Sequence, residues 1–465
     1  MTRVLVVSGD PLGAKVAGPG IRVMEMAQAL ARAGLDVTVA APPTSGDVAG
    51  TAGIAPALAT DSLRTITYDA RGERLREAAV DADAVVVSGL VLAQQPFLAA
   101  LDTPLVVDLY APFVLENLPA GDLGGSGAAG RRRRHAGDVA ALNWQLGRGD
   151  FFVCASEGQR DFWLGCLTSV GRVNPATYAA DPELRRLIDL VPFGLPAEPP
   201  AKRRPALRGV VPGIGDTDPI VLWAGGMWDW LDPGTLVRAV DRVRRQREDV
   251  RLVFMGSRSP NPGVPPPRAV EDTRRLSGEL GLLGTSVFVL DDWVPYHERA
   301  DYLLEADVGA SLHLPHVETR FAFRTRLLDY IWTGLPMVLT EGDVLSRRVS
   351  ERGLGRVVPP GDDDAVAAAI ADLLDSPGGR KGLEPSFAAM RGEMTWSRAV
   401  GPLVAYLEAP LRAPDRPAPG AEPGAMAPTP VAALPARAWE VLREGGPLLL
   451  LEEAARYVRW RRRPR

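Results

Sequence analysis

Short apolar runs alternate with longer segments of helical periodicity along most of the chain. Val4–Val7 and Ala84–Ser88 are nearly continuous apolar runs, which are typical of strands buried on both faces of a parallel sheet. Ile21–Ala33 instead has apolar residues at helical spacing, and Gly34 is placed to end that helix. Because β and α units alternate, the pattern predicts an α/β fold with doubly wound parallel sheets.

The alternation occurs in two series, which predict two Rossmann-like domains facing a central cleft. The first domain is assigned to residues 1–196, with strands at 4–7, 36–42, 84–88, 105–109 and 151–154 and a helix around 158–167. The second is assigned to residues 197–385, with strands at 220–224, 251–255, 287–289, 308–310 and 337–340 and helices at 233–246, 296–305 and 344–352. The proline-rich residues 191–213 between the two series are typical of an inter-domain linker.

Three further segments follow the second domain. Residues 386–410 predict a closing helix with Thr395 as its cap, and the Pro/Ala-rich residues 411–438 predict a disordered linker. Residues 439–465 form a basic amphipathic tail, in which Leu448–Arg465 holds six arginines and two glutamates. This pattern indicates either an interfacial helix attracted to an anionic membrane surface or a tail that packs on the body or has no role.

Composition excludes several classes of protein. The net charge of −4 argues against a chain-wide nucleic-acid interface, and two cysteines are too few for a disulfide framework or a metal cluster. No stretch approaches the roughly 18 apolar residues of a membrane-spanning helix, and Val4–Val7 is too short for a signal sequence. We expect a cytoplasmic protein. Only three of the 53 basic residues are lysines, which suggests a GC-rich bacterial genome.

The segment 320–336, RFAFRTRLLDYIWTGLP, places three arginines within seven residues at the start of a predicted buried helix. A basic helix start opposes the helix dipole unless an anion compensates, so the pattern indicates an anion site. The alternative is that Arg324 and Arg326 pair with Glu318, Asp329 or Asp343. In the first domain, Gly18–Gly20 is a glycine loop just before a helix, but it is neither a GxGxxG fingerprint nor a P-loop.

Two blocks carry a resemblance to a known family. GPGIRVMEMAQALARAGLDVTVAAP and LLDYIWTGLPMVLTEGDVLSRRVSERGLGRVVPPGDDDAVAAAI resemble GT-B glycosyltransferases of family four (group 1), and the likeness covers roughly residues 1–410. The resemblance implies transfer, with retention, of a sugar from a nucleotide-diphosphate donor to a polysaccharide, glycolipid or lipid-linked acceptor. It also implies a role in cell-envelope biosynthesis at the inner face of the membrane. We expect no cofactor and no metal, since arginines and a helix N-terminus can stabilise the leaving diphosphate.

The resemblance also places individual residues. Asp329 stands where the family binds the ribose of the nucleotide, and Arg326 stands where some members carry a lysine. Phe321 stands where the family commonly has another glutamate, so we expect Glu318 to take over that role.

The candidate site residues fall into three groups. The predicted catalytic residues are Arg324, Arg326, Glu318 and Asp108. The predicted donor-binding residues are Gly225, Gly226, Asp229, Arg258, Val294, Asp329, Gly342 and Asp343. The predicted acceptor and anion loop consists of Gly18, Gly20 and Arg22, with Tyr110 at the end of a central strand.

Other charged runs receive simpler interpretations. The acidic runs Asp81–Asp83 and Asp362–Asp364 are interpreted as capping segments rather than metal ligands. Arg131–His135, RRRRH, is interpreted as a solvated surface loop, with contact to phosphorylated lipid carriers as the alternative. Two alternatives to the transferase remain: a GT-B epimerase that acts on the sugar nucleotide alone, and a non-catalytic binding protein on a degenerate GT-B frame.

Overall fold

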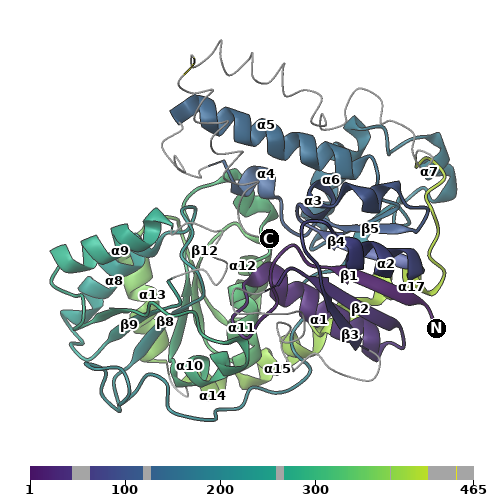
Figure 1. Cartoon of the computed structure of the whole chain (residues 1–465). Coiled ribbons are helices and arrows are strands. Elements are labelled where there is room, and N and C mark those ends of the chain that lie inside the picture. The colour runs from purple at the N-terminus through teal and green to yellow at the C-terminus, as the bar shows by residue number, and fades with distance from the viewer. Residues whose placement is uncertain (44–62, 119–126, 258–266, 377–378, 417–446, 448–465) are drawn as a thin grey trace.

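The fold consists of two parallel β-sheets, each with helices on both faces (Figure 1). The computed structural model describes residues 1–43, 63–118, 127–257, 267–376, 379–416 and 447. The first sheet has seven strands in the order β3-β2-β1-β4-β5-β6-β7, and the second has six in the order β10-β9-β8-β11-β12-β13. The prediction of two doubly wound α/β domains is confirmed.

The first sheet is built from the apolar runs seen in the sequence. Val4 of β1 lies between Val37 of β2 and Ala84 of β4, and four of the five β1 residues are buried. The strands are β1 (Arg3–Val7), β2 (Asp36–Ala41), β3 (Leu63–Thr67), β4 (Ala84–Ser88), β5 (Leu105–Asp108), β6 (Phe151–Cys154) and β7 (Ile188–Leu190). The helices are α1 (Gly18–Arg32), α2 (Glu73–Asp81), α3 (Val91–Gln94), η2 (Pro96–Ala100), α4 (Phe113–Glu116), α5 (Gly127–Leu146), α6 (Glu157–Ser169) and α7 (Pro175–Ala180).

The second sheet repeats this construction. Its strands are β8 (Ile220–Ala224), β9 (Arg251–Met255), β10 (Val287–Val289), β11 (Val308–Ser311), β12 (Met337–Thr340) and β13 (Gly355–Val358). Its helices are α8 (Pro233–Arg244), α9 (Arg268–Glu279), η3 (Tyr296–Glu298), α10 (Arg299–Glu305), η4 (Val317–Phe321), α11 (Thr325–Thr333), α12 (Val344–Glu351) and α13 (Asp363–Leu374). Gly334 ends α11 in the left-handed conformation, as the sequence predicts.

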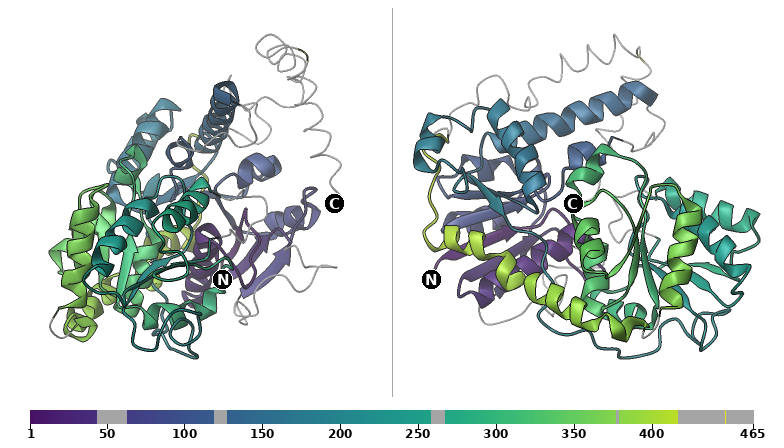
Figure 2. Two further views of the ribbon diagram at one scale, coloured as in Figure 1. Left: turned by 90° about the vertical axis from the view of Figure 1, so that its left-hand side faces the viewer. Right: turned by 180° about the vertical axis from the view of Figure 1, so that it is seen from behind.

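The C-terminal helices join the two domains. The predicted closing helix at 386–410 is divided into α15 (Glu384–Glu393), α16 (Trp396–Ala399) and α17 (Gly401–Glu408), which follow the short α14 (Gly379–Gly382). Thr395 occupies the N-cap position of α16, but its side chain makes no capping hydrogen bond. Figure 2 shows these yellow-green helices running behind the molecule from the second domain to the first. There the Arg416 side chain forms a buried ion pair with Asp150.

Two local predictions are wrong. Gly18–Gly20 is the first turn of α1 rather than a loop before it, because Pro19 favours an early helical position and Ala17 takes the extended N-cap conformation. Arg131–His135 lies in α5, a helix of 20 residues, rather than in a loop. Arginine and alanine are both strong helix formers, which explains why the segment continues the helix.

Three predictions fall wholly or mainly on residues that the structure does not describe. They concern most of the linker at 411–438, the basic tail at 439–465 and Arg258. In the part of the chain that is described, no helix combines the length and the apolar character needed to cross a bilayer.

One buried side chain connects the two domains beside the cleft. Gln159 of α6 is fully buried, and its Nε2 donates hydrogen bonds to the Tyr110 carbonyl at 2.7 Å and to the Phe321 carbonyl at 2.8 Å. Its Oε1 accepts from the Ala155 amide at 2.7 Å. The Phe321 ring packs against Phe162 of the same helix, with 4.9 Å between ring centroids. Phe321 is therefore part of the domain interface.

Gly309 of β11 offers a stability test of this core, because a Cβ at this position would lie 2.8 Å from the ring of Tyr330. Tyr330 anchors α11 to the sheet, because its hydroxyl lies within hydrogen-bond distance of the Leu222 and Ala310 carbonyls, at 3.0 and 2.9 Å. We expect Gly309→Ala to lower the free energy of unfolding by about 1–3 kcal/mol through overpacking, measured by urea denaturation.

The matched control is Gly137→Ala in the middle of α5, where a Cβ meets nothing within 4 Å. It should leave stability unchanged or raise it by up to about 1 kcal/mol, because alanine is the better helix former. Equal effects of the two substitutions would contradict the packing of Tyr330 on Gly309.

Candidate active site

A cavity of about 320 Å³ lies between the carboxyl ends of the two sheets. The first domain contributes the start of α1 and the segment after β5, and the second contributes the turn after β8 and the start of α11. Ligands of doubly wound sheets bind outside the carboxyl ends of the strands, so this is the position expected for a site. The predicted site residues in its wall are Gly18, Tyr110, Gly225, Gly226, Val294, Glu318, Arg324, Arg326 and Asp329.

Arg324 and Glu318 form an ion pair in the cavity wall. The Arg324 Nη2 lies 2.7 Å from the Glu318 Oε2, and only 11% and 2% of the two side chains are exposed. The pairing that the sequence left as an alternative is therefore present, and both residues still face the cavity. The ion pair holds the guanidinium at the N-terminus of α11, where Arg324 is the N-cap residue.

Arg326 is fixed to the end of β8 by its other contacts. Its Nε donates to the Ala224 carbonyl, its Nη2 to the Gly226 carbonyl and its Nη1 to the Ser311 hydroxyl. Its guanidinium lies 4.3 Å from the ring centroid of Trp223. Burial lowers its pKa to about 10, so the side chain remains a cation at neutral pH.

Asp329 and Arg299 form a second ion pair in the wall, with 3.0 Å between the Asp329 Oδ1 and the Arg299 Nε. The guanidinium lies between two rings, 3.6 Å from the centroid of Tyr296 and 4.4 Å from that of Trp332. Tyr296 in turn donates a hydrogen bond of 2.9 Å to Glu25 on α1. Arg299 is not among the predicted site residues, because nothing in its local sequence relates it to a carboxylate 30 residues later.

Glu116 is a further acidic residue in the cavity wall that sequence analysis did not select. It ends α4, eight residues after Asp108, in a segment where only Asp108 and Tyr110 were predicted. Burial and, to a lesser extent, the nearby Glu318 raise the pKa of Glu116 to about 7, although Arg324 opposes this shift. Within the described part of the chain, no hydrogen bond reaches its carboxylate.

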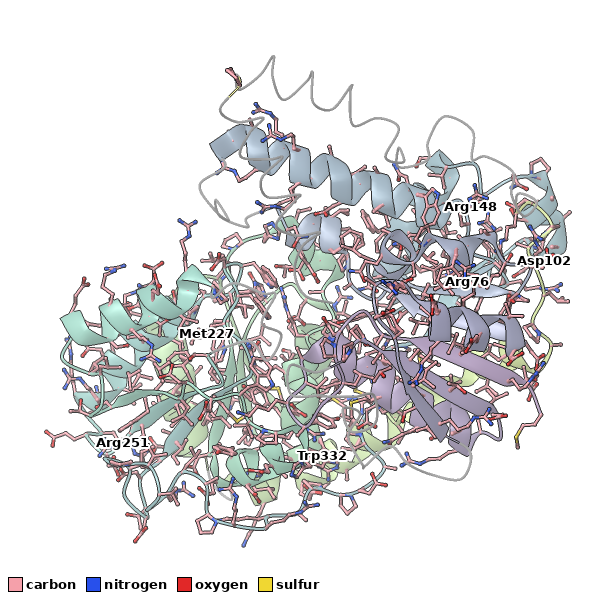
Figure 3. The ribbon with its side chains drawn as sticks, viewed as in Figure 1. Arg76, Asp102, Arg148, Met227, Arg251 and Trp332 are labelled. Carbon is pink, nitrogen blue, oxygen red and sulfur yellow. The ribbon has the colours of Figure 1, made fainter. Side chains whose placement is uncertain are left out.

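The turn after β8 presents two tryptophans to the cavity, beside the buried Met227 that Figure 3 labels. Trp228 and Trp230 are stacked, with 5.7 Å between ring centroids and 9° between planes. Asp229 lies between them in sequence and is directed away, since its Oδ1 accepts a hydrogen bond from the Ala269 amide at the start of α9. The residue predicted to bind the sugar therefore supports a neighbouring helix.

The end of β9 and the segment after β10 form another part of the wall. Gly256 adopts a left-handed φ of +78° and packs against the Trp293 ring, which a Cβ would approach to 3.4 Å. Trp293 donates a hydrogen bond of 3.0 Å to the Val16 carbonyl of the first domain. The predicted donor residue Val294 lies next to it in the cavity wall.

Several predicted site residues lie outside the wall and have structural contacts instead. Arg22 and Asp108 pair with each other, with a shortest separation of 2.6 Å and side chains that are 1% and 0% exposed. A Cβ on Gly20 would lie 2.4 Å from the Val16 side chain, which indicates a packing role. Asp343 caps α12 by accepting from the Leu345 and Ser346 amides, and Gly342 precedes it with a φ of +113°.

The acidic runs form caps and ion pairs. Asp362 accepts a hydrogen bond from the Ala365 amide at the start of α13, and Asp363 pairs with Arg242. Asp83 pairs with Arg3 at the entry to the first sheet. Across the described ranges, no group of three or more His, Cys, Asp or Glu side chains is arranged to hold a metal ion.

The second domain is similar to a known protein family. Residues 218–376 match the family model described as glycosyl transferases group 1. No curated protein matches the sequence.

Solved structures match both domains together. Sucrose-phosphate synthase from Thermosynechococcus elongatus superposes with a TM-score of 0.64 at 16% identity, covering 88% of this chain and 100% of that one. HepE from Anabaena, in complex with UDP-glucose, gives 0.58 at 14% identity, with 88% and 100% covered. WaaG, a glycosyltransferase involved in lipopolysaccharide biosynthesis, gives 0.56 at 15% identity, with 87% and 100% covered. These likenesses confirm the predicted GT-B arrangement of the fold.

The Arg22–Asp108 pair yields a prediction about stability. Arg22→Met would leave the Asp108 carboxylate buried without its partner, which typically costs about 3–5 kcal/mol of unfolding free energy. Urea denaturation would measure this loss, and adding Asp108→Asn should recover part of it. The control Arg3→Met breaks an ion pair whose side chains are 53% and 40% exposed and should have little effect. A similarly small effect of Arg22→Met would show that the buried ion pair does not stabilise the folded protein.

Proposed function

We propose that this glycosyltransferase, whose second domain is a group 1 glycosyl transferase domain, moves a sugar from a nucleotide-diphosphate donor to a glycan or lipid-linked acceptor. The observation that supports the proposal best is the convergence of the α11 N-terminus, Arg324 and Arg326 on the cavity between the two domains. The donor diphosphate occupies this end of the cavity.

The start of α11 is suited to an anion for two reasons. Its free backbone N–H groups and the helix dipole favour negative charge, and its first turn contains no acidic residue. Thr325, the first helical residue, also lines the cavity. The guanidinium groups of Arg324 and Arg326 add charge-assisted hydrogen bonds to phosphate oxygens.

The nucleoside lies along the second domain. Asp329 accepts hydrogen bonds from the ribose hydroxyls, since its side chain is 29% exposed at the cavity wall and held by Arg299. The base lies near Gly256, Trp293 and Val294, where backbone groups and one aromatic ring form the wall.

The reaction depends on stabilising charge that develops on the diphosphate as the bond to the sugar breaks. Arg324 and Arg326 are held in place by Glu318 and by backbone carbonyls before any donor binds. Such preorganised donors reorganise little during the reaction, which is the main source of electrostatic catalysis. The acceptor attacks the same face of the sugar, with retention, and the chain's own cations perform the role that a metal would otherwise have.

The acceptor is a polysaccharide, a glycolipid or a lipid-linked glycan, bound on the first-domain side of the cavity. The likeness to WaaG, a glycosyltransferase involved in lipopolysaccharide biosynthesis, supports an envelope glycan at the inner face of a bacterial membrane. The likeness to HepE with UDP-glucose supports a UDP-sugar donor. A sugar-nucleotide epimerase is the second candidate, because Glu116 and Glu318 place two carboxyl groups in one cavity.

Binding of donors tests the proposal directly. The purified protein is titrated with UDP-, GDP-, ADP- and dTDP-sugars by calorimetry, and thermal shifts confirm the ranking, because a bound donor raises apparent stability. We expect Arg324→Ala and Arg326→Ala each to weaken binding of the best donor at least about tenfold, since a charge-assisted hydrogen bond contributes roughly 1.5–3 kcal/mol.

Arg320→Ala is the matched control, because Arg320 belongs to the same basic segment but is exposed and lies outside the cavity wall. It should bind the donor as tightly as the wild type does. This result would show that contacts inside the cavity, and not the total positive charge of the segment, account for the lost affinity. Unchanged affinity in both cavity variants, with their folds intact, would contradict the assigned diphosphate site. Free epimerised sugar nucleotide among the products would instead favour the epimerase.

A further inference from the structure

We infer that Glu116 is the catalytic residue that accepts the proton of the attacking hydroxyl, so that the first domain supplies a reacting group as well as an acceptor surface. The inference rests on the proposed function. It assigns a specific chemical role to a residue that neither the sequence motifs nor the family match selected.

The position of Glu116 supports this role. Glu116 ends α4 of the first domain, and α4 packs against η4 of the second domain across the cleft. Glu116 therefore faces Glu318 and Arg324 within one cavity, although it comes from the opposite wall. A group in this position meets the acceptor, which enters on the first-domain side, near the diphosphate end of the donor.

The bonding of the other carboxylates around the cavity singles out Glu116. Glu318 pairs with Arg324, Asp329 pairs with Arg299 and Glu25 accepts a hydrogen bond from Tyr296. Asp108 pairs with Arg22, deeper in the first domain. In contrast, no ion pair or hydrogen bond engages the Glu116 carboxylate within the residues that the structure describes, so it is available to a ligand.

The surroundings of Glu116 suit a proton acceptor. Three charged or titratable groups face it: Tyr110 of its own domain, and Glu318 and Arg324 of the other domain. On the neighbouring helix α5, Asp138 accepts a hydrogen bond from Asn117. Burial raises the pKa of Tyr110, so this phenol stays neutral and does not compete as a base. A base works best when its pKa lies near the working pH, and burial and Glu318 raise the pKa of Glu116 to about 7.

The proposed step forms one bond and breaks another at the anomeric carbon of the donor sugar. The acceptor oxygen forms a bond to the anomeric carbon, and its proton passes to a carboxylate oxygen of Glu116. The bond between that carbon and the diphosphate oxygen breaks, and its electron pair leaves with the nucleoside diphosphate. When water is the acceptor, the same step releases the free sugar. Glu116 then returns the proton to solvent when the cleft opens.

The experiment compares Glu116→Gln with the wild type in UDP-glucose hydrolysis, or with whichever of the four donors binds best. Nucleoside-diphosphate release is followed from pH 5.5 to 9, and UDP affinity is measured by calorimetry. A base is active when deprotonated, so the wild-type kcat should rise with pH through a midpoint near 7. Glu116→Gln should lower kcat about 100-fold or more and abolish this rise, with UDP affinity unchanged or tighter.

Two further variants test the assignment. Glu77→Gln removes an exposed carboxylate of α2, outside the cavity wall, and should behave as the wild type does. Glu116→Asp keeps a carboxylate and should restore part of the rate and the pH-dependent rise.

The outcomes distinguish the inference from the proposed function. A Glu116→Gln variant with wild-type kcat and pH profile would overturn the proposed role of Glu116. The proposed transferase function would not be affected by that result. A wild-type protein that neither binds nor turns over any of the donors would overturn the proposed function itself.

Discussion

The side-chain amide of Gln159 holds the two domains together beside the cavity. Its Nε2 donates to the carbonyls of Tyr110 and Phe321, one from each domain, and the whole side chain is buried. A buried amide must satisfy its donors, so separation of these two carbonyls would leave polar groups unpaired. The segments that carry the two carbonyls also carry Glu116 on one side and Glu318 and Arg324 on the other. One hydrogen-bonded group therefore aligns both walls of the candidate site.

A cavity lined with cations requires partners for the buried charges, and the structure provides them separately for each cation. Arg324 has a carboxylate, Arg326 has backbone carbonyls and a tryptophan face, and Arg299 has a carboxylate and two aromatic rings. These contacts reduce the cost of burying charge and fix the direction of each guanidinium. An anion that enters the cavity would meet groups that are already oriented, which is the condition for electrostatic stabilisation of developing negative charge.

Much of the fold could be predicted from the sequence because strands buried on both faces leave a direct pattern. The strands β4, β6 and β8 have the predicted bounds, and β1 begins one residue before its apolar run. The arginine-rich start of α11 was also recognisable, since a basic helix start is locally unfavourable. Pairings between distant segments left no such signal. Nothing local indicates that Asp108 is neutralised by Arg22, that Asp229 turns to α9, or that Glu116 faces the second domain.

Phe321 shows how a missing glutamate can be compatible with a formed site. An acidic side chain at this position would enter the contact with Phe162 and Gln159, where the ring now packs and the carbonyl accepts a hydrogen bond. Glu318 lies in the same turn, η4, and directs its carboxylate to Arg324 in the cavity wall. The turn thus separates two roles between two residues: Phe321 holds the domains together, and Glu318 orients the cation at the start of α11. The absence of a glutamate at position 321 therefore does not by itself indicate a degenerate site, because Glu318, three residues earlier, faces the cavity.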